Sequence, residues 1–385
     1  MKQLSYQLRF NTPAFLGNSE QSAQWRTPPF KALLRQWWRV ARGITDLERL
    51  REEEGRLFGA ANDEGGGSQK SQLRLRLDSW SGGKLQGAWG SDPQVFHQEV
   101  GQNGRNVGAH LYLGYGPLVY QQGTALKHNA AIQAGETNTL RLAWPGREVS
   151  LAELVQLLHW FGTLGGRSRN GWGSLEFDPL HTVEGRGEGA PIAPLAANHP
   201  LLHRVTRPLA ECLRQDWPHA LGLSADGRPL IWQSTSTFAT WREAMQALAR
   251  AKIGFRTDLG FQQGETQNQT KPRDIPFNNR HLLAYPVTHH AVAGWADELR
   301  PGVLKYDRQG WVVQSARLAN QLRFKVAMNT DGTCVSRIFH LPCALPRDLA
   351  QALGRNAPSP QQQAAIWQTI HGWLDNTDLS AFRRI

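Results

Sequence analysis

A short segment in the middle of the chain combines residue types that bind phosphate. Between Leu164 and Ser174 the sequence reads LGGRSRNGWGS, with four glycines and two arginines. Glycine backbones adopt positive φ angles and approach ligands closely, and arginine offers a fork of donors that matches phosphate oxygens. The predicted nucleic-acid contacts in this segment are Gly165, Gly166, Arg167, Arg169, Gly171, Trp172 and Gly173. Trp172 is expected to be exposed at the loop tip, where an indole stacks on a base.

Two better-known phosphate motifs do not account for this segment. No Gly-Lys-Ser/Thr sequence follows the glycines, so it is not a Walker loop. The segment leaves a helix and enters a strand, which is the reverse of the dinucleotide-binding fingerprint. The remaining alternative is a tight helix-to-strand connection whose arginines are merely solvated.

A basic helix is predicted near the N-terminus. Thr27 and the two prolines after it favour a helix start, and the apolar spacing continues to about Arg42. The basic stripe on one face of this helix consists of Lys31, Arg35 and Arg39. No Asp or Glu occurs between Glu20 and Asp46, so the stripe is interpreted as a phosphate track rather than a solvated, charge-balanced face. Trp38 is a second candidate for base stacking, although its spacing also suits the core.

A third basic strip lies in the C-terminal part of the chain. The runs 318–326 and 334–341 predict two strands joined by a turn at Thr330-Asp331-Gly332. Side chains two residues apart share a face of a strand. Arg317, Arg323 and Lys325 are therefore expected on one face and are predicted to contact the phosphates of a nucleic acid.

The histidines offer an alternative in which the chain cuts RNA. A histidine general base with a nearby Lys or Tyr could activate a 2′-hydroxyl without a metal ion. The pair His289-His290 is the most interesting candidate. The other candidates are His110, His128 and His159. Histidine also contacts phosphates and bases, so a binding role for these residues remains open.

Composition points to a polyanionic partner. The 43 Lys and Arg outnumber the 32 Asp and Glu, the formal charge is +11 and the pI is near 9.9. The basic residues are spread along the chain, which favours nucleic acid over a membrane surface. The three cysteines lack metal-ligand spacing and no apolar run is long enough to span a membrane. We therefore expect a cytoplasmic protein without metal or other cofactor.

The order of predicted elements indicates an α+β fold. Strands 4–10, 72–77, 109–120, 137–143 and 175–177 are interleaved with helices at 27–42 and from Ser150 to Phe161, the second opened by a Ser150/Glu153 capping box. This is the ferredoxin-like (RRM-like) βαββαβ plan. We predict a first ferredoxin-like domain over 1–180 with the glycine-rich loop at 162–174, a linker over 181–200, and a second ferredoxin-like domain over 201–385.

Several stretches together resemble the RAMP superfamily of CRISPR-associated proteins. They are 11–17 (NTPAFLG), 26–39 (RTPPFKALLRQWWR), 57–59 (LFG), 65–68 (GGGS), 161–174 (FGTLGGRSRNGWGS) and 317–326 (RLANQLRFKV). The chain looks most like the first RAMP subunit of the type III-B Cmr effector complex. It departs from the family at Ala32, at Asn18, at Asn170, where an arginine is usual, and at Gln321, where a proline is usual.

The resemblance implies tandem ferredoxin-like domains in a multisubunit ribonucleoprotein for antiviral defence. Its expected partners are CRISPR RNA, target RNA and other RAMP subunits, and its expected role is RNA binding rather than cutting. Two alternatives remain at this point. One is a metal-independent endoribonuclease that matures CRISPR RNA through a histidine, and the other is mainly a protein–protein scaffold of the same complex.

Overall fold

The structure is a computed structural model that describes most of the chain. The described residues are 2–20, 22–61, 68–86, 88–101, 103–128, 131–146, 150–180, 188–259, 279–284, 305–306, 312–313 and 318–385. Three of the predicted site residues, Arg317, His289 and His290, lie outside these ranges, as does nearly all of the predicted loop 260–279.

The first half of the chain builds a four-stranded antiparallel sheet in the order β2-β7-β1-β8. Its elements are β1 (Lys2–Phe10), α1 (Thr27–Arg42), β2 (Arg74–Leu77), β7 (Thr137–Trp144), α4 (Leu151–Phe161) and β8 (Leu175–Pro179). The alternation predicted for the first strand is confirmed, since Tyr6, Leu8 and Phe10 are fully buried in the core.

The second half builds another four-stranded antiparallel sheet, in the order β14-β15-β11-β16. Its elements are β11 (Ile231–Ser234), α7 (Trp241–Thr257), β14 (Leu322–Met328), β15 (Cys334–His340), α9 (Pro360–Asp375) and β16 (Phe382–Arg384). If the four strands of each sheet are numbered along the chain, their order across the sheet is 2-3-1-4 in both cases. In each half a helix follows the first strand and another precedes the last, so both halves share one connectivity.

Shorter elements decorate these two sheets. They are α2 (Leu47–Phe58), β3 (Gln94–His97), β4 (Arg105–Gly108), α3 (Ala109–Gly114), β5 (Leu118–Tyr120), β6 (Thr124–Leu126), α5 (Pro200–Val205), β9 (Thr206–Pro208), α6 (Leu209–Cys212), β10 (Leu221–Leu223), η2 (Asn279–Leu282), β12 (Lys305–Tyr306), β13 (Val312–Val313), α8 (Arg347–Leu353), η3 (Gly354–Asn356) and α10 (Thr377–Ser380). The strands β3 and β4 pair with each other, as do β5 and β6, β9 and β10, and β12 and β13.

Two local predictions were wrong, and one helix was missed. The run 109–120 is not one strand, because α3 occupies its first half and β5 its end. Helix α2 was not predicted at all. At the start of α4 the Ser150 side chain makes no capping hydrogen bond, so the expected capping box does not form. By contrast, α7 begins with a complete capping box between Thr240 and Glu243.

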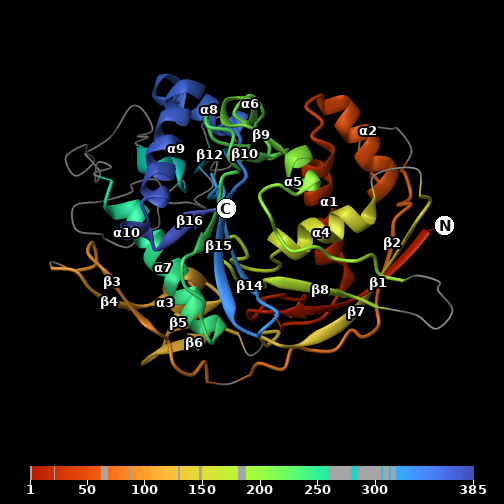
Figure 1. Cartoon of the computed structure of the whole chain (residues 1–385), viewed down its shortest axis with the longest axis horizontal. Helices are drawn as coiled ribbons and strands as arrows, with labels where there is room; N and C mark the ends of the chain where they lie inside the picture. Colours follow the sequence, from red (N-terminus) through yellow and green to blue (C-terminus); the bar gives the residue numbers. More distant parts are fainter. Residues whose placement is uncertain are drawn as a thin grey trace.

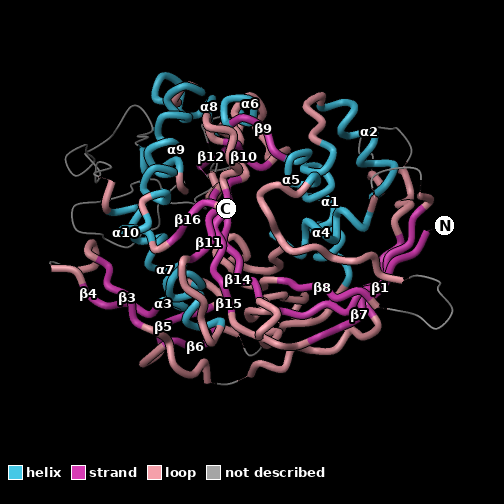
Figure 2. Tube along the Cα trace, viewed as in Figure 1, coloured by secondary structure: helices cyan, strands magenta, loops and turns pink. Residues whose placement is uncertain are grey.

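The two halves share their hydrophobic cores. The core beneath the first sheet includes Trp37 and Phe161 from the first half, and the Phe339 ring of the second half lies 5.0 Å from that of Phe161. The other core joins Trp172 of the first half to Phe324 of the second. Figure 1 shows the β14–β15 hairpin between the helices of the second half and the first sheet with α1 and α4. Strand β8 lies beside β14 where the two sheets meet (Figure 2).

Candidate nucleic-acid interface

The glycine-rich loop that connects α4 to β8 has a conformation that its glycines require. The φ angles of Gly165 and Gly171 are +102° and +91°, in the region that side chains rarely adopt. A Cβ on Gly165 would lie 2.8 Å from the carbonyl oxygen of Phe15. At Gly173 φ is +63°, and a Cβ would lie 1.9 Å from the carbonyl oxygen of Leu164. The glycines therefore shape the loop against neighbouring backbone.

Replacing Gly173 with Ala is expected to destabilise the protein by roughly 3 kcal/mol or more, through the strained φ and the backbone overlap together. Urea unfolding monitored by tryptophan fluorescence measures this loss. Gly166→Ala is the matched control, because the nearest atoms to its Cβ are side-chain carbons of Pro117 and Phe15 at 3.3 and 3.4 Å. Equal stability of the two variants would show that the loop relaxes freely around position 173.

The loop is held from both halves of the molecule. Thr12 donates its hydroxyl to the carbonyl of Gly171 at 2.8 Å. From the second half, the backbone N–H of Phe324 in β14 donates to the carbonyl of Arg169 at 3.0 Å. These contacts fix the backbone on either side of Asn170, so the loop is presented in one conformation.

Asn170 anchors the middle of the loop. Its Nδ2 donates to the carbonyl of Leu113 at 2.7 Å, and its Oδ1 accepts from Lys252 Nζ of α7 at 3.0 Å. Burial, and then the charges of Arg256 and Arg167, lower the pKa of Lys252 to about 7. The asparagine that departs from the family pattern is thus a buried structural residue in a cation-rich environment. Neither Asn170 nor Lys252 was predicted as a site residue.

The indoles predicted to stack on bases are both buried. Trp172 is fully buried, and the centroid of its ring lies 5.1 Å from that of Phe15 and 5.5 Å from that of Trp89. Trp38 is also fully buried and packs edge-on against Phe58. The expectation of an exposed Trp172 was wrong because the loop turns inward toward the shared core, and neither indole presents a face to a ligand in this structure.

Arg167 and Arg169 are the exposed part of the loop. Arg167 has a φ of +56°, and its guanidinium lies against Gly116, whose Cβ would be 3.3 Å from Nη2. Within the ranges that the structure describes, no carboxylate forms an ion pair with either arginine. The contact of these two guanidinium groups with phosphate stays a prediction.

Two of the three residues of the basic stripe on α1 share one carboxylate partner. Arg35 and Arg39 both form ion pairs with Glu54 of α2, and Arg39 Nη2 lies 2.9 Å from Glu54 Oε1. Glu54 is buried, which opposes its ionisation, but the hydrogen bonds and charges of Arg39 and Arg35 hold its pKa below the ordinary value. The inference that this face lacks acidic partners was wrong, because the partner comes from the unpredicted helix α2. Lys31 is half-buried on the same helix.

The C-terminal strip is buried rather than exposed. Lys325 is fully buried, and its Nζ donates to the carbonyls of Leu158, Gly162 and Leu175 at 3.1, 3.0 and 2.6 Å. Two of these carbonyls end helix α4, where the helix dipole is negative and attracts a cation. The prediction that Lys325 is a surface residue for RNA was therefore wrong. It joins β14 to the first half of the chain.

Two arginines of the second sheet lie at the same interface. Arg323 is 8% exposed, and its terminal nitrogens meet Gln36 of α1 when the amide oxygen of Gln36 faces them. Arg337, which was not predicted, donates to the carbonyl of Trp160 at 2.8 Å and to Gln233 at 3.0 Å. The alternation that placed Arg323 and Lys325 on one face of the strand was sound, but that face packs against the first half.

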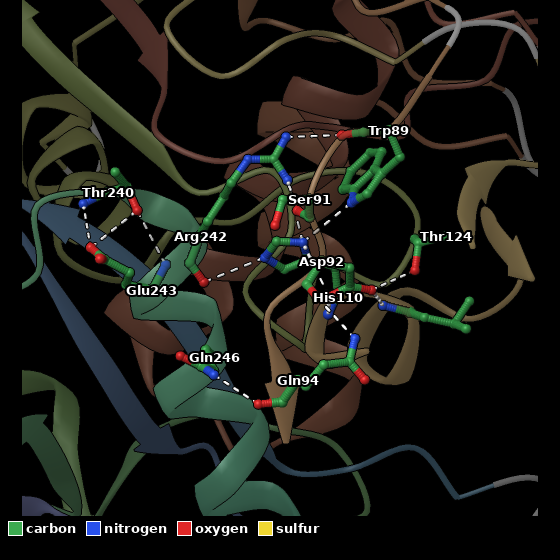
Figure 3. Close-up of polar contacts among 11 residues, drawn as sticks. Trp89, Ser91, Asp92, Gln94, His110, Thr124, Thr240, Arg242, Glu243 and Gln246 are labelled. Carbon is green, nitrogen blue, oxygen red and sulfur yellow. Dashed lines mark hydrogen bonds and ion pairs between the residues drawn. The ribbon is translucent and has the colours of Figure 1, made fainter. Parts of the chain in front are cut away.

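A polar cluster attaches the connection between β2 and β7 to α7 (Figure 3). Asp92 accepts from the backbone N–H groups of His110 and Leu111 at 2.8 and 3.0 Å, and so caps helix α3 from a distant part of the chain. Trp89 Nε1 donates to His110 Nδ1 at 3.2 Å. Arg242 of α7 donates to the carbonyl of Trp89 at 3.0 Å. Through the hydrogen bond of Arg242 to Trp89, the cluster links the second half of the chain to the first.

The described histidines of the cutting hypothesis differ in exposure. Burial lowers the pKa of His110 to about 4 and that of His159 to about 3, which leaves both neutral inside the protein. His128 is exposed.

No group of three or more His, Cys, Asp or Glu side chains within the described ranges could hold a metal ion. No described helix is long and apolar enough to cross a membrane.

No protein-family model and no curated protein matches the sequence. Among solved structures, the chain is similar to the apo form of Cmr1 from Pyrococcus furiosus, with a TM-score of 0.41 and 13% identity over 90% of each chain. It is also similar to a chain of the type III-B Cmr-beta complex bound to cognate target RNA, with a TM-score of 0.45 and 11% identity over 96% of this chain and 100% of that one. A chain of the same kind of complex bound to cognate target RNA and AMPPnP, in the presence of single-stranded DNA, matches with a TM-score of 0.43 and 10% identity over 96% and 99% of the two chains.

Proposed function

We propose that this chain is an RNA-binding RAMP subunit of a type III, Cmr-like CRISPR ribonucleoprotein. The observation that carries the proposal is the pair Arg167 and Arg169, exposed without carboxylate partners among the described residues, on a loop whose backbone is fixed from both halves. A fixed loop spends little conformational entropy when it binds, so its cations can contribute their interaction with phosphate to affinity.

Three further observations support this assignment. The charge of +11 favours a polyanion. One of the sequence stretches that resemble the RAMP superfamily, 161–174, contains the loop. Both sheets have the strand order and connectivity of a ferredoxin-like unit, which supports a division into domains at 1–180 and 201–385 around a linker at 181–200. The expected partners are CRISPR RNA, target RNA and neighbouring RAMP subunits.

The proposed interface is centred on the glycine-rich loop rather than on α1. Because Glu54 neutralises much of the charge of Arg35 and Arg39, Lys31 is the member of that stripe without a described ion pair. Contacts between basic side chains and phosphates position a protein on the RNA backbone and carry little sequence information. Base pairing by the guide would then supply the specificity, and the subunit would bind RNA without cutting it.

A titration of the purified protein against labelled single-stranded CRISPR RNA that contains a repeat tests the proposal. The titration is repeated across a salt series, and the RNA is then run on a denaturing gel. We expect binding that weakens steeply with salt and leaves the RNA intact, because phosphate contacts release counterions. Site-specific cleavage without metal would instead identify an endoribonuclease, and absence of binding at low salt would contradict RNA contact by the isolated subunit.

The double substitution Arg167→Ala, Arg169→Ala should weaken RNA binding by about tenfold or more and make the salt dependence shallower by about one unit of slope. Folding should be unchanged, since both side chains are exposed. The control Arg49→Ala, Arg56→Ala removes the same charge from exposed positions on α2, far along the chain from the loop. Equal affinity of the two double variants would remove the loop from the interface.

A further inference from the structure

The glycine-rich loop and β14 bring two arginines together at the junction of the halves. Asn170 and Phe324 form a parallel bridge, and the N–H of Phe324 donates to the carbonyl of Arg169 at 3.0 Å. Arg169 and Arg323 are the residues immediately before these bridge partners. The backbones of the two arginines therefore lie next to each other, and the charge of Arg169 acts on Arg323.

Arg323 occupies an electrostatically costly position. It is 8% exposed, its Nε has no hydrogen-bond partner among the described residues, and its terminal nitrogens reach only the amide oxygen of Gln36. No described carboxylate forms an ion pair with it. Burial, and then the neighbouring charge of Arg169, lower the pKa of Arg323 to about 9. A buried cation without a counter-charge is expensive to keep.

Other buried basic side chains in the described part of the chain have more hydrogen-bond partners or an ion pair. Lys325 meets three carbonyls, and Arg337 meets a helix-terminal carbonyl and a glutamine. Arg280 forms an ion pair with Glu99. Arg323 has one described hydrogen-bond partner, Gln36, and the charge that acts on it most is that of Arg169, whose own side chain is exposed.

We propose that Arg169, Arg323 and Gln36 form a seat for one phosphate group. Two guanidinium groups side by side offer paired donors to the oxygens of a single tetrahedral anion, and the bound anion supplies the counter-charge that Arg323 lacks. Gln36 holds the Arg323 fork in position from α1. The phosphate is either a free anion or part of an RNA backbone, and only the second source rests on the proposed function.

The first test is thermal unfolding of the full chain in phosphate-free buffer, with and without inorganic phosphate, at ionic strength matched with chloride. Phosphate should raise the midpoint of the native protein, because a ligand that binds only the folded state stabilises it. Arg323→Met should abolish that increase. Without phosphate this variant should unfold no earlier than the native protein, since methionine fills the space without a buried charge.

A purely structural Arg323 gives the opposite pattern. Arg323→Met would then unfold earlier in phosphate-free buffer and would respond to phosphate as the native protein does, which overturns the proposal. If Arg323→Met does not fold, Arg169→Ala decides the matter, because that side chain is exposed. A phosphate response that survives in Arg169→Ala also overturns the proposal. Arg141→Met is the control, since this exposed arginine is paired with Asp78 and should keep the full response.

A second measurement distinguishes the source of the phosphate. Arg323→Met and Arg141→Met are titrated with the same labelled single-stranded RNA. A loss of about tenfold in RNA affinity in Arg323→Met alone assigns the seat to an RNA phosphate. Unchanged RNA affinity, together with a lost response to inorganic phosphate, assigns it to a free anion. If the native protein binds no RNA yet responds to phosphate through Arg323, the seat stands and the RNA-binding function fails.

Discussion

Replacing Lys325 with Met should destabilise the protein by about 3 kcal/mol, although the sequence alone marks this lysine as a surface contact for RNA. The ammonium group has three N–H donors, and the carbonyls of Leu158, Gly162 and Leu175 accept from it at 3.1, 3.0 and 2.6 Å. Methionine has a similar length but no donor. The variant loses these three hydrogen bonds, which link β14 of the second half to the end of α4 and to β8 of the first half.

Urea unfolding monitored by circular dichroism measures this effect. Lys70→Met is the matched control, because Lys70 is exposed and its replacement changes the net charge equally. If Lys325 were a surface residue for RNA, the two variants would be equally stable and Lys325→Met would bind RNA more weakly. A loss of stability confined to Lys325→Met confirms a structural role for the lysine.

Acidification from pH 7 to pH 5 should lower the free energy of unfolding by about 2 kcal/mol for each deeply buried histidine. Burial lowers the pKa of His110 and His281 to about 4 and that of His159 and His371 to about 3, and it holds the pKa of His340 well below its ordinary value. In the unfolded chain these groups take up protons near pH 6.5. The unfolded state therefore binds more protons throughout this window, and stability falls as the pH falls.

Several such groups together approach the whole stability of a typical protein, which is about 5–15 kcal/mol. Denaturant unfolding at pH 5, 6, 7 and 8 in phosphate-free buffers measures the slope. The carboxylates held at low pKa, such as Glu54, contribute only at more acidic pH, so the window between 7 and 5 reports the histidines. His159→Gln should make the slope shallower by one histidine, while the exposed His128→Gln should leave it unchanged. A stability independent of pH in this window would refute the prediction.

The sequence predicted the regular elements well where local signals are strong. The alternation from Leu4 to Phe10, the double proline at the start of α1 and the Thr330-Asp331-Gly332 turn all lie where the structure has β1, α1 and the β14–β15 connection. Positive φ angles at Gly165 and Gly171 were also expected from the glycines alone. These features depend on residues close together in the chain.

Features that depend on distant partners were not predictable in the same way. The start of helix α3 is capped by Asp92, which lies outside the helix in the segment before β3, so the residues of the helix alone resemble a strand. Arg35 and Arg39 were interpreted as unpaired because their partner Glu54 belongs to α2. Neither the charges nor the hydrophobic periodicity of the sequence predicted that helix. Periodicity placed Lys325 on a face of its strand correctly, but it could not tell that this face is covered by the first half of the chain.

The hydrogen bond from β14 to the carbonyl of Arg169 has a consequence for the synthesis of the protein. During translation, the glycine-rich loop leaves the ribosome well before β14 has been synthesised. A nascent chain therefore carries Arg167 and Arg169 before the strand that fixes their backbone exists. A chain whose translation stops before β14, which begins at Leu322, would carry these arginines on a loop without that hydrogen bond.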